Sequence, residues 1–327
     1  MKVLLLVLIL VSCSGSNKYT DLSYYKNGKF LNYQKGPDRG FGDFFKWQFN
    51  GKKQKWPERV DLTTLNIGVP DSSIKPIITF IGHSTFLIQV NGLNILTDPV
   101  FSERVSPVSW AGPKRVIKAA IVKEKMPKID FIIVSHNHYD HLDIDSLRFF
   151  KKRDNSKIYA GLEVGDVDSD LEIEEMGWWE QRNFNGTEIV FTPCQHFSGR
   201  GLFDRNETLW GGFYLKSQLF KVYFAGDTGY SSHFKKFKER FGEVDLAILP
   251  IGAYEPRWFM KYVHMNPEEA IKAHQDLNPK LSLGMHWGTF QLTDESRLEP
   301  VQKINKLTQE LDIKNFQVLE FGESLSL

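Results

Sequence analysis

The 327-residue sequence is poor in cysteine, in net charge and in long hydrophobic runs. Its two cysteines are too few for a disulfide framework or for a zinc site built from thiolates. The formal charge is +1, from 41 basic and 40 acidic residues, which argues against a dedicated nucleic-acid-binding protein. Because 25% of the residues are charged and 13% are aromatic, a disordered or fibrous chain is also excluded. The length is sufficient for one large domain with a substantial core.

A short apolar run, Val3 to Val11, lies near the N-terminus. A helix of nine residues rises ~14 Å, about half of the hydrocarbon thickness of a bilayer, so it does not span a membrane. A basic residue, a short apolar run and small residues in this order are typical of a secretory signal. Leu10-Val11-Ser12-Cys13 resembles the bacterial lipobox, which implies removal of residues 1–12 and lipidation of Cys13. We therefore expect an exported protein, lipid-anchored in the bacterial cell envelope; an ordinary signal that contains a cysteine is the alternative.

The near-neutral total conceals an uneven distribution of charge. Residues 18–60 carry ten Lys and Arg but only four Asp and Glu, so the remainder of the chain is mildly acidic. Residues 13–76 are expected to form a basic, aromatic N-terminal arm without sustained helical or strand periodicity. The arm either packs over the domain or faces a membrane, with bases near anionic head groups and aromatics at the interface. Its densest aromatic cluster comprises Phe41, Phe44, Phe45, Trp47 and Phe49.

From residue 77 onward, apolar runs bounded by turn residues predict strands, and helical patterns lie between them. Early hairpins followed by strand–helix alternation favour two sheets with helices outside them, in one catalytic domain over residues 77–327. Helices are expected at 140–151, 231–241, 266–277 and 296–311. The expected strands are 77–81, 85–90, 93–96, 131–134, 157–160, 188–191, 212–215, 222–225, 246–249 and 282–285.

Histidines and aspartates follow four of these strands at their carboxyl ends. Directly after strand 131–134, an extended turn can direct His136 and His138 to one point, while Asp140 and His141 are expected at the start of the next helix. A cluster of imidazoles is costly as core filling, because each polar nitrogen needs a partner. Seven nitrogen and oxygen ligands without a thiolate predict a site for two metal ions, with Zn as the default and Fe or Mn compatible. The predicted ligands are His136, His138, Asp140, His141, His196, Asp227 and His286.

This set of residues resembles the ligand pattern of the metallo-β-lactamase superfamily. The resemblance implies the α/β architecture of that superfamily, a four-layer αβ/βα sandwich. It also implies a division of the ligands between the two metals, with Asp227 bridging them. One metal would be held by His136, His138 and His196, and the other by Asp140, His141 and His286.

A narrower resemblance is to the N-acylphosphatidylethanolamine phospholipase D family. It implies a phosphodiesterase that hydrolyses such phospholipids to N-acylethanolamine and phosphatidate, using a hydroxide between the metals that Asp227 orients. His264 is a candidate to protonate the leaving oxygen or to bind phosphate. The motifs that carry the resemblance are 81–85 (IGHST), 96–102 (LTDPVFS), 112–115 (GPKR), 135–143 (SHNHYDHLD), 225–230 (AGDTGY), 249–260 (LPIGAYEPRWFM) and 264–270 (HMNPEEA).

Four further residues and three further functions complete the hypotheses. His83 is interpreted as a structural histidine, with a group that bonds a ligand or Asp98 as the alternative, and Cys194 as a small buried neighbour of the site rather than a ligand. Arg257 and Lys261 are equally compatible with a phosphate contact and with solvated surface charge. A lactonase, a nuclease and a non-catalytic metal-binding envelope lipoprotein are the alternative functions. The expected partners are a phospholipid substrate and a membrane surface, and not nucleic acid.

Overall fold

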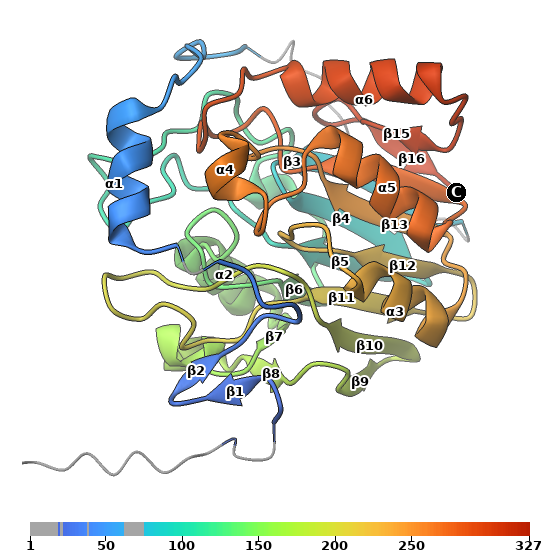
Figure 1. Ribbon diagram of the computed structural model, residues 1–327. Helices are drawn as coiled ribbons and strands as arrows, with labels where there is room; N and C mark the ends of the chain where they lie inside the picture. Colours follow the sequence, from blue (N-terminus) through green and yellow to red (C-terminus); the bar gives the residue numbers. More distant parts are fainter. Residues whose placement is uncertain (1–18, 20–21, 38, 62–74) are drawn as a thin grey trace, which may run out of the picture.

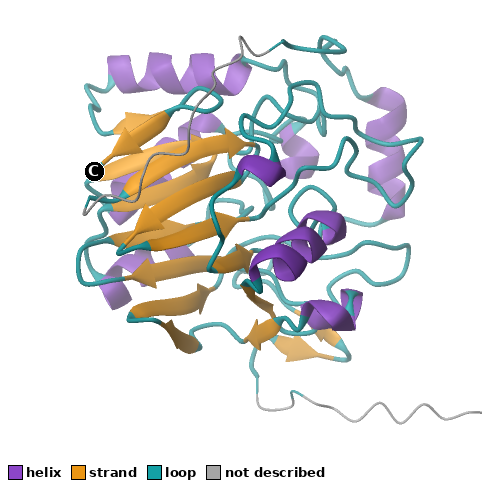
Figure 2. Cartoon of the chain, turned by 180° about the vertical axis from the view of Figure 1, so that it is seen from behind, coloured by secondary structure: helices purple, strands orange, loops and turns teal. Residues whose placement is uncertain are grey.

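The computed structural model describes residues 19, 22–37, 39–61 and 75–327 (Figure 1). The expected signal segment 1–12 and the expected lipidation site Cys13 lie outside the described residues. Two seven-stranded sheets pack against each other, and helices cover their outer faces (Figures 1 and 2). This architecture confirms the αβ/βα sandwich that was expected from the sequence.

The first sheet has the strand order β16-β3-β4-β5-β6-β7-β8. Antiparallel hairpins join β3, β4 and β5, and Asn91 and Gly92 adopt positive φ in the second of them, as the hairpin motif requires. From β5 to β8 the strands are parallel, and β16 pairs antiparallel with β3. The strands are β3 (Ile77–Gly82), β4 (Thr85–Val90), β5 (Leu93–Thr97), β6 (Phe131–Val134), β7 (Lys157–Gly161), β8 (Glu174–Met176) and β16 (Ser324–Ser326).

The second sheet has the order β15-β14-β13-β12-β11-β10-β9, antiparallel from β9 to β12 and parallel from β12 to β15. As a result β10, β12 and β14 run in one direction, and their carboxyl ends lie at the same edge. The strands are β9 (Gln181–Phe184), β10 (Thr187–Thr192), β11 (Gly212–Lys216), β12 (Lys221–Phe224), β13 (Leu246–Pro250), β14 (Leu281–Met285) and β15 (Phe316–Gln317).

Aromatic side chains fill the space between the two sheets. Phe80 and Phe131 come from the first sheet and Phe191 and Phe213 from the second, and all four are fully buried in one cluster. Burial of such a side chain stabilises the fold by about 1.5–3 kcal/mol relative to exposure. The packed interior therefore gives the strand ends a rigid frame.

The main helices follow the predicted ones closely, with one displaced start. The helix expected at 140–151 begins only at Ile144, because Asp140 and His141 lie in a turn and Asp143 occupies the cap position. The helix predicted at 266–277 begins directly after Asn266, which caps it and forms a capping box with Glu269. The helices are α2 (Ile144–Asp154), α3 (His233–Phe241), α4 (Arg257–Met260), α5 (Pro267–Leu277) and α6 (Glu299–Glu310), with short 3₁₀ helices at Lys123–Lys125, Val164–Val167 and Ser169–Leu171.

The N-terminal arm is more regular than the sequence suggested. It contains a short hairpin, β1 (Tyr25–Lys26) and β2 (Lys29–Phe30), and a helix, α1 (Phe41–Asn50). The sequence of the arm shows no sustained helical period although it contains α1, because α1 carries aromatics on its buried and its exposed side. None of the helices in the described ranges is long and apolar enough to cross a membrane.

One side of α1 packs onto the domain, and the other side is exposed. Trp47 packs onto the domain: it is 5% exposed and its indole nitrogen donates to Asp294 Oδ1 at 2.9 Å. Phe45 and Phe49 point away from the domain, with exposed fractions of 54% and 83%.

Candidate metal centre

All seven predicted ligands meet at the edge where β6, β10, β12 and β14 end. Four overlapping groups of side chains are close enough to hold a metal ion, and two of these groups share no residue and adjoin each other. His264, from the loop after α4, lies beside them. His83, from the turn between β3 and β4, joins the second group, although its sequence context favoured a structural role. The nearly parallel strand ends thus bring together residues that are far apart in the sequence.

The first group consists of three histidines from two loops. His136 Nε2 lies 2.8 Å from His138 Nδ1, and His196 Nε2 lies 3.3 Å from the same atom. Burial, followed by the neighbouring histidines, lowers the pKa of His138 to about 3. Burial likewise lowers the pKa of His196, to about 4. Neutral imidazoles with converging nitrogens are the form of histidine that binds metals.

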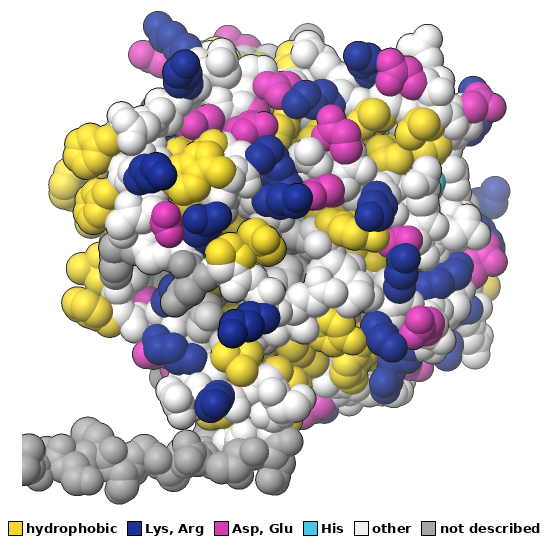
Figure 3. Space-filling view, in the orientation of Figure 1, with side chains coloured by type: hydrophobic (Ala, Val, Ile, Leu, Met, Phe, Trp, Pro, Cys, Tyr) yellow, Lys and Arg dark blue, Asp and Glu magenta, His cyan; other side chains and the backbone are white. Residues whose placement is uncertain are grey.

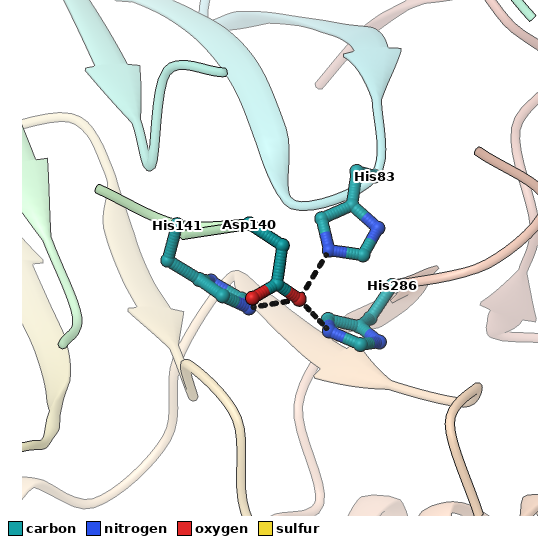
Figure 4. Close-up of side chains that lie close together, drawn as sticks. All are labelled: His83, Asp140, His141 and His286. Atoms are coloured by element: carbon teal, nitrogen blue, oxygen red, sulfur yellow. Dashed lines mark hydrogen bonds and ion pairs between the residues drawn. The ribbon is translucent and has the colours of Figure 1, made fainter. Parts of the chain in front are cut away.

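The second group is centred on one carboxylate oxygen (Figure 4). Asp140 Oδ2 lies 3.1 Å from His83 Nε2, 3.3 Å from His286 Nε2 and 3.5 Å from His141 Nε2. These three histidines come from three different segments of the chain and point toward the same oxygen. The carboxylate therefore forms the middle of this group.

Asp227 lies between the two groups. Its Oδ2 is 3.0 Å from His286 Nε2 and 3.1 Å from His141 Nε2, and 3.9 Å from both His196 Nε2 and His264 Nδ1. A carboxylate in this position has donors of both groups within reach. This is the place in which a bridging ligand would stand.

Outer hydrogen bonds fix which nitrogen of two of these histidines faces the centre. His196 Nδ1 lies 2.8 Å from Val263 O, and a carbonyl only accepts, so Nδ1 carries the proton. His141 Nδ1 lies 2.6 Å from Asp98 Oδ2, which is fully buried. In the neutral form of both rings, Nε2 then carries no proton and directs its lone pair into the site, where it can bind a metal. The same arrangement occurs in the carboxylate–histidine pairs of metal sites.

The same carboxylate orients a third ring through a serine. Ser135 Oγ donates to Asp98 Oδ2 at 2.7 Å, so it accepts from His136 Nδ1 at 2.9 Å. Ser135 N also donates to Asp98 Oδ1 at 2.7 Å. Asp98 therefore supports a histidine of each group, whereas from the sequence it was considered only as a partner of His83.

The electrostatics of the site also favour a cation. Every ion pair of Asp140 and Asp227 within the described residues is with a histidine. Burial alone would lower the pKa of His141, but Asp227 and Asp140 outweigh it and raise that pKa well above its ordinary value. Burial would likewise raise the pKa of Asp227, yet His141 and His286 hold it well below its usual range. A divalent cation can supply the positive charge that these buried carboxylates require.

Two buried atoms of the predicted ligands face the centre and make no hydrogen bond among the described residues, although one of them, in His141, forms the ion pair with Asp227 described above. They are His141 Nε2 and Asp227 Oδ1. Buried polar atoms normally have partners, so such orphans need an explanation. Metal ligation explains both, and the nitrogen and oxygen donors suit Zn, Fe or Mn. The residues present therefore fit the metals that the sequence predicted.

The loops of the site adopt unusual backbone conformations. His83 and His286 have φ values of 58° and 63°, which lie in the left-handed region that residues other than glycine rarely adopt. At Gly252 an added Cβ would lie 2.1 Å from His286 O, so no larger residue fits there. Backbone conformations of this kind persist where the surrounding structure holds them in place. They are typical of functional sites.

The remaining predicted residues lie around the centre. His264 is 8% exposed, and its Nδ1 has no hydrogen-bond partner in the described chain. Arg257 neither faces solvent freely nor points into the site, because it donates to His264 O at 2.9 Å and to Glu269 at 2.7 Å. Lys261 is exposed. Cys194 is buried, and its Sγ lies 3.2 Å from Asp227 O.

An arginine that the sequence did not single out fastens the ligand loops to each other. Arg200 Nη1 donates to Asn137 O at 2.8 Å and to Leu142 O at 2.9 Å. Its guanidinium lies 3.8 Å from the centre of the Tyr139 ring. The loop after β10 thereby braces the loop after β6, which carries four of the ligands.

Comparison with known proteins agrees with this geometry. The model of the family described as "Beta-lactamase superfamily domain" matches residues 93–287. The "N-acyl-phosphatidylethanolamine-hydrolyzing phospholipase D 1" of Caenorhabditis elegans is 39% identical, over 75% of this chain and 74% of that protein. A Saccharomyces cerevisiae protein, "N-acyl-phosphatidylethanolamine-hydrolyzing phospholipase D, mitochondrial", is 40% identical over 71% of this chain and 51% of that protein.

A solved structure shares the fold at lower identity. The possible metal-dependent hydrolase of Veillonella parvula superimposes with a TM-score of 0.63 at 18% identity, over 77% of this chain and 100% of that one. This likeness extends the agreement to the architecture of the two sheets.

Proposed function

Because the chain belongs to the β-lactamase superfamily and is a metal-dependent hydrolase by fold and by its relatives, we propose that it is a phosphodiesterase with a binuclear metal centre. Its substrates are N-acylphosphatidylethanolamine-like phospholipids, and its products are N-acylethanolamine and phosphatidate. One observation carries the proposal: the carboxylate of Asp227 lies between two groups of metal-binding side chains. The names of the two relatives support the choice of substrate.

The two groups divide the ligands between the metals. In this proposal His136, His138 and His196 hold one metal, Asp140, His141 and His286 hold the other, and Asp227 binds both. Zn is the metal we expect, and Fe or Mn suits the same donors. Two bound metals supply neutralisation of phosphoryl oxygens and a water of lowered pKa.

Two side chains of the site, Asp227 and His264, act on the attacking water and on the proton that is transferred. Water adds to phosphorus and releases one proton, the bond from phosphorus to the ethanolamine oxygen breaks, and the leaving alkoxide takes up that proton. Asp227 orients the attacking water. His264, whose Nδ1 lies 3.9 Å from Asp227 Oδ2, is placed to deliver the proton to the leaving oxygen.

The surface near the site suits a lipid bilayer. Hydrophobic side chains gather over α1 (Figure 3). The loops 106–110 and 200–205 lie on the same side of the molecule as α1 (Figure 1). Lys46 and the bases at 52–55 flank the aromatic side chains. Apolar anchors with neighbouring bases bind anionic membrane surfaces. The most exposed anchors are Phe49 at 83%, Trp110 at 80%, Leu202 at 68% and Phe203 at 85%.

The proposed location completes this picture. We infer that the chain is exported, that residues 1–12 are removed and that acylated Cys13 anchors it in the bacterial envelope. Mass spectrometry of the membrane-extracted protein tests this part: an N-terminal diacylglyceryl cysteine is expected. An intact Met1 would contradict it.

The activity is tested with N-acylphosphatidylethanolamine in mixed micelles. We expect phosphatidate release that a chelator abolishes and that Asp227→Ala also abolishes without loss of the folded circular dichroism spectrum. Asp145→Ala, an exposed aspartate of α2, is the matched control and should retain activity. Metal-dependent hydrolysis of lactones but not of the phospholipid would overturn the proposed choice of substrate. Hydrolysis that resists chelation, or full activity of Asp227→Ala, would overturn the mechanism.

A further inference from the structure

The N-terminal arm reaches into the loop that carries the ligand His196. Asn32, two residues after β2, makes two hydrogen bonds to the backbone of that residue. Its Nδ2 donates to His196 O at 2.7 Å, and its Oδ1 accepts from His196 N at 2.9 Å. The side-chain amide thus engages both polar groups of the ligand's main chain, as a neighbouring strand would.

Flanking contacts keep the arm in register with this loop. Gln34 N donates to Gln195 Oε1 at 3.0 Å, and Gln195 Nε2 donates back to Gln34 O at 2.7 Å. On the other side of Asn32, Phe30 N donates to Asn206 O at 2.8 Å. The arm segment 30–34 is therefore bonded to the ligand loop on both sides of His196.

The family match begins at residue 93, so this segment lies outside the matched domain. From these contacts we propose that Asn32 is a positioning residue of the metal centre, through which the arm holds His196 in its ligating position. Val263 fixes the ring of His196 and Asn32 fixes its backbone. The inference rests on the proposed metal site, but it does not depend on which substrate is hydrolysed.

The contacts of Asn32 with His196 are distinct from the contacts that attach the arm to the domain. Phe30 is fully buried in the main core and is the apolar anchor of the segment. Asn32 is only partly buried, and its bonds go to a single residue. Its substitution should therefore leave the arm attached while the backbone of His196 loses its partner.

The test uses the full chain, purified in detergent, with Asn32→Asp and Asn32→Ala. Asp keeps the acceptor but turns a carboxylate oxygen toward His196 O, so it should do more damage than Ala. Asn305→Asp, an exposed position of α6, adds the same charge elsewhere. Metal content is measured against graded chelator, and the visible absorption spectrum is recorded for the Co²⁺-loaded protein.

We expect one of the two metals to bind on the order of 10-fold more weakly in Asn32→Asp, the lower end of the effect of outer partners of metal ligands. The Co²⁺ spectrum should change, and Asn305→Asp should match the unaltered chain. Equal affinity and an unchanged spectrum in both Asn32 variants would overturn the inference. So would equal weakening of both metals together with a lower unfolding temperature of the metal-free chain, which would mean a purely structural contact.

The unaltered chain separates this inference from the proposed function. Binding of two metals without hydrolysis of the phospholipid would overturn the phospholipase activity and leave the role of Asn32 standing if its variants lose one metal. An unaltered chain that binds no metal would overturn both.

Discussion

Replacement of Asp98 by asparagine tests how strongly the outer carboxylate controls the metal centre. Asp98 is fully buried and accepts three hydrogen bonds: 2.7 Å from Ser135 N, 2.7 Å from Ser135 Oγ and 2.6 Å from His141 Nδ1. Asparagine has nearly the same shape and can keep the bond from Ser135 N. Its NH₂ group would then face the N–H of His141, which brings two donors together.

The size of the effect follows from the lost bond to His141, because the bond with Ser135 Oγ can reverse: a hydroxyl oxygen also accepts from an NH₂ group. A hydrogen bond to a charged group contributes about 1.5–3 kcal/mol. His141 can avoid the conflict by moving its proton to Nε2, but Nε2 is the atom that faces the site. Since ~1.4 kcal/mol corresponds to a factor of ten, metal affinity should fall about 10- to 100-fold.

Competition with a chromophoric chelator measures this affinity directly. Asp143→Asn is the matched control, because Asp143 is also a buried carboxylate with several donors, including Ser102 N at 2.9 Å and Ser146 Oγ at 2.6 Å, and it contacts no ligand. It should lower stability without changing metal affinity. Equal affinities in Asp98→Asn and the unaltered chain would refute the assigned role, and so would an equal loss in both variants.

Three further outcomes are expected. His264→Ala should lower kcat about 10²- to 10⁴-fold with unchanged metal content, and an unchanged kcat would contradict a proton-transfer role. Phe49→Ser combined with Phe203→Ser should weaken binding to anionic vesicles while leaving hydrolysis of a short-chain soluble analogue intact, whereas Leu311→Ser, at an exposed position directly after α6, should bind as before. Asn266→Ala should lower the free energy of unfolding by about 0.5–2 kcal/mol in a urea titration, and no loss would mean that the capping box contributes little.

Strong local signals explain what could be predicted. Buried strands such as Phe131–Val134 are continuous apolar runs, and the ligands follow them directly. Asn266 and Pro267 mark a helix start by their chemistry alone. These features depend on neighbours in the sequence, so the sequence sufficed for ten of the fourteen strands of the two sheets and for three of the four helix starts to within a few residues. It also indicated the residues that the structure brings together at the candidate metal centre.

Features that depend on tertiary contacts could not be predicted. His83 lies in a tight turn, and only the pairing of β3, β4, β5 and β6 in one sheet brings that turn to Asp140. Asn32 is separated from His196 by 164 positions and has no motif around it. The helix α1 lacks a side-chain cap at Gly40 and an apolar face of its own. In each case the decisive partner comes from a distant part of the chain.

Strand β16 has a consequence for how the protein folds. Its pairing with β3 joins Thr79 to Ser324, residues 245 positions apart. Loop closure over such a distance costs little extra free energy, since each doubling of length adds ~0.6 kcal/mol, but contacts of high contact order form slowly. Because β3 ends one residue before His83, the edge that supports the second ligand group is among the last parts to form. Metal uptake should therefore coincide with the slowest phase of refolding.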